Sequence, residues 1–514
     1  YNKTIRVVGD YDVDGIISTY ILTTVINDLG GIVDYHIPNR VDDGYGINKE
    51  IIKKAYDDNV SLIITCDNGI QALKEVDYAK ELGIDIIITD HHDLSFIEKN
   101  GERQYVLPNA NAVVNPKNSN CEYPFKNLCG AGVAYKVLEY LSVNLFEREK
   151  EYIYSFLEYV SIATIADVVE LKGENRIIVK YGLKLLNETK NLGLSTLIKE
   201  LELKSPIGVY HVGFIIGPTL NATGRLDTAD KGVELLKSTE PSLAYELSKE
   251  LKYLNETRKK MTEMGINDII DTIENSDIKN NDILVVYNSE IHESIAGIIA
   301  GRIKDKYYKP TIVLTDADDG GCKGSARSID EYNIFEGLTE CKELLSKFGG
   351  HPMAAGLSLE KDNIDKLRSC LNKNSKLSKD DLTKKYYIDI PLPIDYVNFD
   401  LIYEIGKLEP YGVGNPRPSF GAKDLKINRL YKLGRDRKIL KFDLETEDSI
   451  YEGILFNNIE EFEEEVINKY GENTLELMYK GEETNFKFDI IFNPNINEFR
   501  GRTSIQIIIE NYRM

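Results

Sequence analysis

Residues 4–15, with the sequence TIRVVGDYDVDG, decide the first part of the fold. Residues 5–8, with the sequence IRVV, are rich in β-forming residues and are typical of a short β-strand. Three aspartates follow this strand at every second position, namely Asp10, Asp12 and Asp14. Because residues i and i+2 of an extended chain point the same way, two or three of these carboxylates can converge on one spot. The stretch therefore predicts a strand that ends in a cluster of negative charge.

Two further predicted strands carry polar residues at the same end. Residues 62–64 lead into Asp67 in IITCDNG, and residues 84–88 lead into the DHH triplet 90–92 in IIITDHH. Amphipathic, helix-like stretches separate the strands, which favours a parallel α/β sheet. In such a sheet, the crevice at the carboxyl ends of the strands is the usual ligand site. The expected helices between the strands span residues 47–56 and 72–82.

The number of acidic residues at this edge points to metal ions. A single aspartate after a strand is more often a turn former or a helix N-cap. So many converging carboxylates, however, would repel one another and destabilise the fold unless cations neutralised them. His91, and Asp167 at the end of the apolar stretch SIATIAD, add two further donors. Carboxylates with imidazole and no thiolate suit Mn²⁺ or Mg²⁺ better than structural zinc, and a bridging carboxylate can hold two ions about 3.5–4 Å apart.

The middle of the chain has a helical pattern. We expect a first domain over residues 1–200, largely helical from residue 128 onward, and a connecting segment over residues 201–275. Apolar residues at spacings of three and four predict a long helix over residues 228–275, with Pro241 as an interruption near its start.

Two more domains are expected after this helix. Residues 276–375 repeat the α/β pattern, and residues 386–514 change to alternating strands that suggest a small β-barrel of the OB type. The predicted elements are strands at residues 283–287, 311–314, 439–444, 486–492 and 504–509 and a helix at residues 294–305.

Composition bounds the class of protein. With 514 residues, 42% hydrophobic and 29% charged, the chain is too long for one core and ordinary for a globular protein. No apolar run approaches the roughly 18 residues of a membrane span. The net charge of −21 argues against nucleic-acid binding over the whole surface, although residues 421–440 carry a net charge of +5. The chain starts at Tyr1 without Met, so we expect that a segment precedes it.

The six cysteines show no CxxC pair and no zinc-like spacing. We expect scattered thiols in a reducing cytoplasm.

Several motifs together resemble the DHH phosphoesterase superfamily and, within it, the RecJ family. DYDVDG, Asp67, the DHH triplet and Asp167 match the superfamily. The likeness spans nearly the whole chain, and it implies a DHH domain joined by a long helix to a second α/β domain, called DHHA1, and then to an OB-like barrel. The motifs that resemble RecJ are HIPNRVDDGYG (36–46), LCGAG (128–132), GPTLNATGRLD (217–227), GSARS (324–328), GGHPMAAG (349–356) and LEPYGVGNPRPSF (408–420).

The resemblance implies a ligand set for two divalent ions, with Mn²⁺ favoured and Mg²⁺ as the alternative. Asp12 and Asp67 would bind one ion. The other ion would lie among Asp67 as the bridging ligand and Asp14, His91 and Asp167. His92 would contact the scissile phosphate, and Asp10 would act as a ligand or orient one. Many superfamily members carry a histidine four residues before the first metal aspartate, where this chain has Val8, which weakens the expected hold on the first ion.

The resemblance also implies substrate contacts in the second domain. Arginine suits phosphate oxygens because its guanidinium is a planar fork. Two assignments have ordinary alternatives, since His351 before Pro352 can shape a turn and Arg225 can pair with Asp227. Tyr45 is either a base-stacking residue or a half-buried loop tyrosine. The expected phosphate-binding residues are Arg40, Arg225, Ser325, Arg327 and His351.

In the barrel, basic and aromatic residues would guide the incoming strand, unless they form a solvated face over core aromatics. The expected guide residues are Lys432, Arg435, Arg437 and Lys438, with Tyr431 and Phe442 as stacking platforms.

The resemblance implies an exonuclease that degrades single-stranded DNA from the 5′ end to 5′-mononucleotides in DNA repair and recombination. It implies a cytoplasmic monomer that works with a single-stranded-DNA-binding protein and a helicase, with no membrane contact. Two alternatives stay open: a phosphodiesterase of short oligoribonucleotides or cyclic dinucleotides, and a catalytically silent scaffold that binds DNA. Inorganic pyrophosphatase is weaker, because it leaves residues 390–514 without a role.

Overall fold

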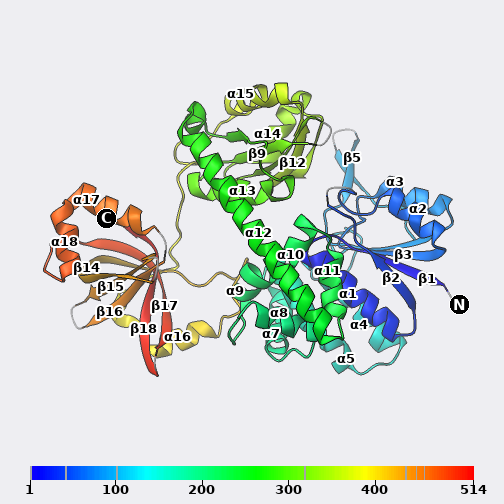
Figure 1. Ribbon diagram of the computed structural model, residues 1–514, viewed down its shortest axis with the longest axis horizontal. Coiled ribbons are helices and arrows are strands. Elements are labelled where there is room, and N and C mark those ends of the chain that lie inside the picture. The colour runs from blue at the N-terminus through cyan, green and yellow to red at the C-terminus, as the bar shows by residue number, and fades with distance from the viewer. Residues whose placement is uncertain are drawn as a thin grey trace. The chain divides into compact units, whose positions relative to one another are not determined.

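The computed structural model describes residues 3–40, 43–99, 102–317, 320–434, 437–446, 449–456, 458–499 and 501–514. The chain separates into two compact units, Tyr1–Lys384 and Lys385–Met514 (Figure 1). The first unit contains two five-stranded sheets with their helices and a small two-stranded sheet of β5 (Ser95–Lys99) and β6 (Glu102–Val106), and the second unit contains a β-barrel. Among the described residues, no helix combines the length and the apolar character that crossing a membrane requires.

The first sheet confirms the predicted parallel α/β arrangement. Its five strands lie in the order β2-β1-β3-β4-β7, and all neighbours are parallel. The three strands that carry the acidic residues are therefore direct neighbours, and their carboxyl ends share one edge. The bounds are β1 Thr4–Val8, β2 Ile32–His36, β3 Val60–Cys66, β4 Asp85–Thr89 and β7 Ala112–Val114.

Helices cover both faces of this sheet. Val7 packs into one core with helix α1 (Val13–Asp28), whereas Val8 packs into a second core with α2 (Lys49–Asp57) and α3 (Leu73–Glu81). Neighbouring strand residues point to opposite faces, so each strand feeds both cores. Val8 is fully buried and is therefore a core residue at the position where many superfamily members have histidine.

The following helices behave as expected, with one correction. Pro241 does not interrupt the long helix but begins it, where its missing N–H breaks no helical hydrogen bond. The residues before it form the separate helix α11. The bounds are α4 Gly130–Tyr140, α5 Lys150–Tyr154, α6 Leu157–Ala166, α7 Gly173–Asn187, α8 Leu192–Glu200, α10 Gly217–Leu226, α11 Asp230–Lys237 and α12 Pro241–Glu274.

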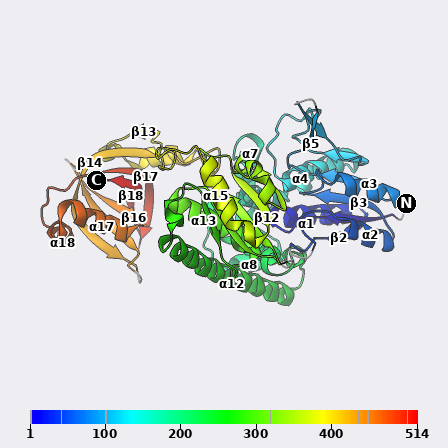
Figure 2. The same ribbon diagram turned by 90° about the horizontal axis from the view of Figure 1, so that it is seen from above.

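The second sheet of the first unit has the order β11-β12-β10-β9-β8. Only β8 and β9 are parallel neighbours, and the other pairs are antiparallel. Both views place α13 beside the long helix α12 (Figures 1 and 2), which joins the two sheets. The bounds are β8 Leu284–Tyr287, α13 Glu293–Tyr307, β9 Thr311–Asp316, β10 Cys322–Arg327, α14 Ile334–Glu340, β11 Lys347–His351, β12 Ala354–Leu359 and α15 Ile364–Asn374.

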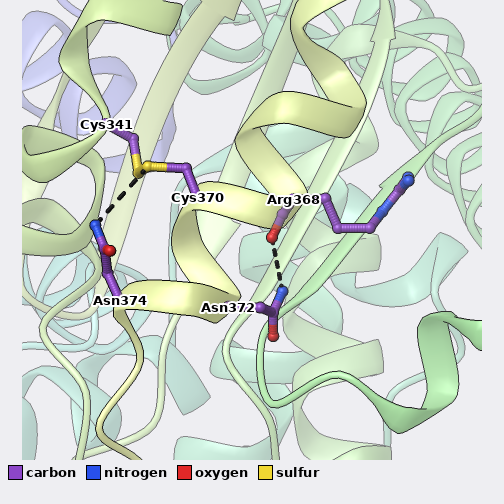
Figure 3. Close-up of a disulfide and its surroundings, with 5 residues drawn as sticks. All are labelled: Cys341, Arg368, Cys370, Asn372 and Asn374. Atoms are coloured by element: carbon purple, nitrogen blue, oxygen red, sulfur yellow. Dashed lines mark hydrogen bonds between the residues drawn. A yellow bond between two sulfur atoms is a disulfide. The ribbon is translucent and has the colours of Figure 1, made fainter.

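A disulfide corrects the expectation of six free thiols. Cys341, at the end of α14, is bonded to Cys370 in α15 (Figure 3). The amide of Asn374 lies 3.9 Å from the Cys370 sulfur. The pairing was invisible in the sequence because a separation of 29 positions gives no spacing signal, and only the packing of α14 on α15 brings the two cysteines together.

The second unit confirms the predicted OB-like barrel. Five long strands form a closed ring, because β14 pairs with β17 in addition to the order β14-β15-β16-β18-β17. Phe442 is fully buried and packs against Phe462 and Phe488, so its expected role as a stacking platform is wrong. The bounds are β13 Ile390–Pro391, α16 Phe399–Gly406, β14 Phe420–Leu433, β15 Ile439–Glu445, β16 Ile450–Leu455, α17 Ile459–Tyr470, α18 Glu472–Lys480, β17 Phe488–Phe499 and β18 Arg502–Arg513.

Candidate metal centre and phosphate site

The strand ends bring the predicted acidic residues together. Donor atoms of Asp10, Asp12 and Asp67 lie within 4.8 Å of one another. Two further groups meet the same distance limit, Asp14 with His91 and Asp167, and Asp67 with His91 and His92. Asp67 and His91 each belong to two groups, so the three groups form one continuous cluster. This sharing gives Asp67 the place that a bridging ligand needs.

Helix N-termini position two of the carboxylates. Asp12 is the N-cap of α1, where its Oδ1 accepts hydrogen bonds from the backbone N–H groups of Asp14 and Gly15. The side chain of Asp14 accepts from Gly130 N–H at 2.5 Å and from Ala131 N–H at 2.8 Å, at the start of α4. Free N–H groups at a helix start attract anionic partners, so these hydrogen bonds hold both carboxylates in fixed orientations.

Asp67 sits in a strained position that its surroundings enforce. Its φ angle is +61°, in the left-handed region that non-glycine residues rarely occupy. Gly130 allows this close approach, because a Cβ there would lie 2.7 Å from the Asp67 carboxylate oxygen. Such strain is typical of functional sites.

His91 faces the centre of the cluster. Its Nε2 lies 3.1 Å from Asp67 Oδ1 and 3.7 Å from a carboxylate oxygen of both Asp14 and Asp167. Burial lowers the pKa of His91 to about 3, and the charge of His92 acts in the same direction. A neutral imidazole is the form that binds a metal ion.

Asp90 orients His92, a role that the sequence did not reveal although Asp90 belongs to the quoted triplet. The Asp90 Oδ1 lies 2.7 Å from His92 Nδ1 and accepts from the backbone N–H of His91 and His92, and its Oδ2 accepts from Ile70 N–H. Burial alone lowers the pKa of His92, but the hydrogen bond and charge of Asp90 raise it to about 9. The His92 imidazole is therefore a proton-bearing group at neutral pH.

Burial makes the other carboxylates costly to ionise. It raises the pKa of Asp10, Asp67 and Asp167 well above the usual range, and the neighbouring aspartates add to the effect. Burial also raises the pKa of Asp14, to about 6. One oxygen each of Asp10, Asp67 and Asp167 is buried without a hydrogen-bond partner. Unpaired buried oxygens and mutual repulsion are what divalent cations would relieve, so this donor set fits two such ions.

A cavity of about 390 Å³ lies between the two sheets of the first unit. Tyr11 and Arg40 line it from the first sheet's side, and Ser325 and Gly349 from the second sheet. The Arg40 guanidinium lies 4.7 Å from the centre of the Tyr11 ring. The structure therefore brings together two of the predicted phosphate-binding residues, Arg40 and Ser325, and adds Tyr11, which stands between two of the metal-site aspartates and had no assigned role.

Arg225 does not form the alternative ion pair with Asp227. It donates to the Ser294 carbonyl at 2.6 Å, and Asp227 pairs with Lys231. Burial and the charge of Arg40 lower the pKa of Arg225 to about 10, and the same two causes lower the pKa of Arg327. Cations that are buried beside other cations favour the arrival of an anion.

His351 and Tyr45 lie at the edges of the metal site. His351 is exposed, and its Nδ1 lies 3.6 Å from Asp93 Oδ2, in the loop that follows His92. The Tyr45 hydroxyl donates to the Asp67 carbonyl at 3.2 Å and lies 3.3 Å from the His92 ring nitrogens. The Tyr45 side chain remains half exposed, and its stacking role stays a prediction.

The barrel's predicted guide residues have different surroundings. Lys432 is neutralised by an ion pair of 2.8 Å with Glu463, whereas Arg437 and Lys438 are exposed. Tyr431 donates to Asp443 and lies against Arg429 and Lys441. The remaining predicted residue, Arg435, lies outside the described residues.

Three family descriptions match consecutive parts of the chain: "DHH family, N-terminal domain" over residues 4–164, "DHHA1 domain" over residues 280–376 and "RecJ OB domain" over residues 388–511. Over 99% of its length, the chain is 36% identical to the "Single-stranded-DNA-specific exonuclease RecJ" of Bacillus subtilis and 33% identical to that of Salmonella typhimurium. It covers 61% of the first protein and 87% of the second. The chain belongs to the RecJ family.

Solved structures agree with this membership. The crystal structure of RecJ from Thermus thermophilus in complex with Mn²⁺ matches the whole chain with a TM-score of 0.82 and 25% identity, and the chain covers 69% of it. A structure of exonuclease RecJ bound to manganese matches 72% of the chain with a TM-score of 0.62 and 29% identity, and the match covers 90% of that protein. Metal binding by these RecJ proteins agrees with the geometry of the acidic cluster.

Proposed function

We propose that the protein is a metal-dependent exonuclease that digests single-stranded DNA from the 5′ end and releases 5′-mononucleotides. The observation that carries this proposal is the cluster of buried aspartates with His91 next to a cavity that Arg40 and Ser325 line. A carboxylate cluster can hold divalent ions, and an arginine-lined cavity can hold a phosphate.

The protein's own residues suit phosphodiester hydrolysis. Asp12 and Asp67 would hold one ion. The other ion would be held by Asp14, Asp67, His91 and Asp167. Asp10 would act as a further ligand or orient one of the ligands. The bound ions would lower the pKa of a water molecule and neutralise charge on the phosphate. His92 carries a proton that Asp90 keeps in place, so it can donate a hydrogen bond to a phosphate oxygen.

The second sheet would determine the direction of digestion. Arg40, Arg225, Ser325 and Arg327 would hold a 5′-phosphate, with His351 at the edge towards the metal site. A strand anchored in this way exposes its first internal phosphodiester to the metal centre. Hydrolysis there releases one 5′-mononucleotide and leaves a new 5′-phosphate, so the strand can advance by one nucleotide.

The barrel would hold the strand behind the site, with Arg437 and Lys438 against phosphates and Tyr45 stacking on a base at the metal site. A single-stranded-DNA-binding protein and a helicase are the proposed partners of a monomer. A cytoplasmic location is also a proposal. The Cys341–Cys370 disulfide requires that this pair meets oxidising conditions, which are unusual there.

Digestion of a 3′-labelled, 5′-phosphorylated 20-mer tests the proposal. With Mn²⁺, the wild-type protein should release 5′-mononucleotides from the single strand and leave duplex intact, and EDTA should stop the reaction. Asp67→Ala and His91→Ala should lower turnover by at least 1000-fold while the circular dichroism spectrum stays unchanged. Preferential cleavage of dinucleotide RNA or cyclic di-AMP, or equal inactivity of wild type and variants, would contradict the proposal.

Arg327→Ala tests the 5′-phosphate assignment. This variant should lower kcat/KM about tenfold on a 5′-phosphorylated strand and have little effect on a 5′-hydroxyl strand, because only the former presents a dianion to the guanidinium. Equal kinetics of variant and wild type on phosphorylated ends would remove Arg327 from the site.

A further inference from the structure

The second sheet of the first unit presents three rows of residues on the face that borders the cavity. The pairing of β9, β10, β12 and β11 places partners side by side in each row. One row consists of Arg327, Ala354 and His351, and the next consists of Ser325, Gly356 and Gly349. These two rows contain three of the residues assigned above to the 5′-phosphate, Ser325, Arg327 and His351. The third row consists of Thr315, Lys323, Ser358 and Lys347, which have no role so far.

The third row belongs to the cavity. Thr315, Lys323, Ser358 and Lys347 all line it, together with Arg40. The row shares a face with the other two because side chains two residues apart along a strand point the same way. The middle row contains two glycines, so no side chain separates the third row from Ser325.

The third row lies at the end of the cavity away from the metal site. His351, in the first row, reaches Asp93 at 3.6 Å, immediately after His92. Lys347 stands four residues earlier on β11, which corresponds to about 13 Å along a strand. A 5′-phosphate in the middle row would therefore have the metal site on one side and the two lysines on the other.

The cavity carries more positive charge than a terminal monophosphate needs. Arg40, Lys323 and Lys347 line it, and the one acidic side chain among its lining residues is Glu293. Glu293 forms an ion pair of 3.0 Å with Lys323 and neutralises one of the three cations. Of the other two cations, Arg40 lies near Arg225 and Arg327, because its charge, together with burial, lowers the pKa of both.

We propose that Lys323 and Lys347, with Arg40, hold the outer phosphates of a 5′-di- or 5′-triphosphorylated strand, so that the enzyme also digests polyphosphorylated ends. This inference rests on the proposed exonuclease function and adds a substrate class to it. The first phosphate would lie over the middle row, at Ser325. The outer phosphates would extend from there past the two glycines to Lys323 and Lys347.

The proposed reaction has a distinctive first product. Water attacks the phosphorus of the first internal phosphodiester, and a new P–O bond forms as the bond to the 3′-oxygen of the first nucleotide breaks. That oxygen takes up a proton and leaves as a 3′-hydroxyl. The first turnover therefore releases a nucleoside 5′-triphosphate intact, the remaining strand starts with a 5′-monophosphate, and later turnovers release monophosphates.

The test compares one 20-mer DNA with a 5′-triphosphate, a 5′-monophosphate or a 5′-hydroxyl end, using the full chain and Mn²⁺. The wild type should digest the triphosphorylated strand with a kcat/KM within threefold of that for the monophosphorylated strand. Chromatography should show one deoxynucleoside triphosphate per strand, followed by monophosphates.

Three variants test the role of the two lysines of the third row. Lys323→Ala with Lys347→Ala should lower kcat/KM at least tenfold on the triphosphorylated strand and less than twofold on the monophosphorylated strand. Glu293→Gln, which frees Lys323 from its ion pair, should raise the kcat/KM on the triphosphorylated strand relative to that on the monophosphorylated strand. Lys366→Ala, on the exposed side of α15, is the matched control and should change neither value.

The possible failures are distinguishable. If the wild type digests the monophosphorylated strand but not the triphosphorylated one, the inference is wrong and the proposed function stands. The same conclusion applies if the double variant affects both ends equally, or if free deoxyadenosine triphosphate inhibits digestion while the triphosphorylated strand stays intact. If no strand is digested, the proposed function itself has failed.

Discussion

At the scale of single residues, the candidate centre buries carboxylates that have too few hydrogen-bond partners. Asp10, Asp67 and Asp167 each bury an oxygen without a hydrogen-bond partner, and burial raises the pKa of all three. By contrast, backbone N–H groups hold Asp12 and Asp14. The folded chain thus stores electrostatic strain at the position where a ligand with positive charge would remove it.

Asp90 gives the sharpest single-residue prediction. Asp90→Asn should lower kcat about 10- to 100-fold, the usual effect of losing a group that orients a site residue. It should also lower the pKa of His92 from about 9, because the negative charge that raises it is gone. The measurement is the pH dependence of kcat together with NMR titration of His92.

Asp85→Asn is the matched control for Asp90→Asn. Asp85 is an exposed aspartate at the opposite end of β4, where it accepts a hydrogen bond from Asn111. This variant should change neither kcat nor the titration of His92. A lowered kcat in Asp90→Asn without any change in the pKa of His92 would refute the orienting role.

Metal binding and pH should be coupled. The pKa of Asp14 is about 6 in the folded protein and about 4 in an unfolded chain, so its contribution to stability is present below pH 4 and lost as pH rises through 6. The pKa values of Asp10, Asp67 and Asp167 are also raised, so their contributions to stability change with pH in the same direction. Metal ions bind the deprotonated carboxylates and should restore this stability.

Thermal unfolding measures this coupling. Saturating Mn²⁺ should raise Tm, relative to EDTA, by several degrees more at pH 8 than at pH 5.5. His91 has a pKa of about 3 and is neutral at both values, so its titration does not contribute to the difference. The Asp67→Ala variant should lose most of the Mn²⁺ effect, and an equal effect of Mn²⁺ at both pH values would contradict the linkage.

At the scale of elements, the disulfide fastens α14 to α15 behind the second sheet. The covalent loop between Cys341 and Cys370 contains both β11 and β12, which form part of the cavity floor. By loop-closure entropy, a link across 29 positions stabilises the fold by about 3.5 kcal/mol. Reduction should therefore lower the Tm of the first unit.

Alkylation under non-reducing denaturing conditions, followed by mass spectrometry, should leave Cys341 and Cys370 unmodified. Cys341→Ser should lower Tm and remove its sensitivity to reductant. Cys121→Ser, which changes a half-buried free thiol, should keep both properties of the wild type. Modification of all six cysteines in freshly purified protein would disprove the bond.

At the scale of the whole molecule, the net charge of −21 leaves binding of a polyanion to a few basic places. Arg437 and Lys438 are exposed on the barrel, whereas Glu463 already neutralises Lys432. Phosphate contacts release counterions, and each contact adds about 0.7 to the slope of log affinity against log salt for a single strand.

Arg437→Ala with Lys438→Ala should therefore reduce that slope by about 1.4. Lys432→Ala should leave it nearly unchanged. Fluorescence anisotropy of a labelled single strand between 50 and 300 mM salt measures the slope, with Asp67→Ala in the background to prevent digestion. A larger loss for Lys432→Ala than for the double variant would reverse the assignment.

The sequence by itself determined the architecture and most members of the acidic cluster. Alternation of short apolar strands with amphipathic helices predicts a parallel sheet, and acidic residues directly after three strands must then share an edge, because parallel strands end on the same side. The prediction of the barrel strands also succeeded, because the periodicity that marks a strand is a local property of the sequence. The prediction that Phe442 stacks on a base failed, because the sequence of a strand does not show whether an aromatic side chain points into the core or outward.

Only the tertiary structure decided which distant residues meet. The hydrogen bonds from α4 to Asp14, the Cys341–Cys370 bond, and the ion pair of Lys432 with Glu463 join residues whose separation along the chain carries no periodic signal. Lys323 and Lys347 likewise share a row with Thr315 and Ser358 only because of the register in which β9 to β12 pair. Local pattern fixes where elements form, whereas packing and strand register fix which side chains become neighbours.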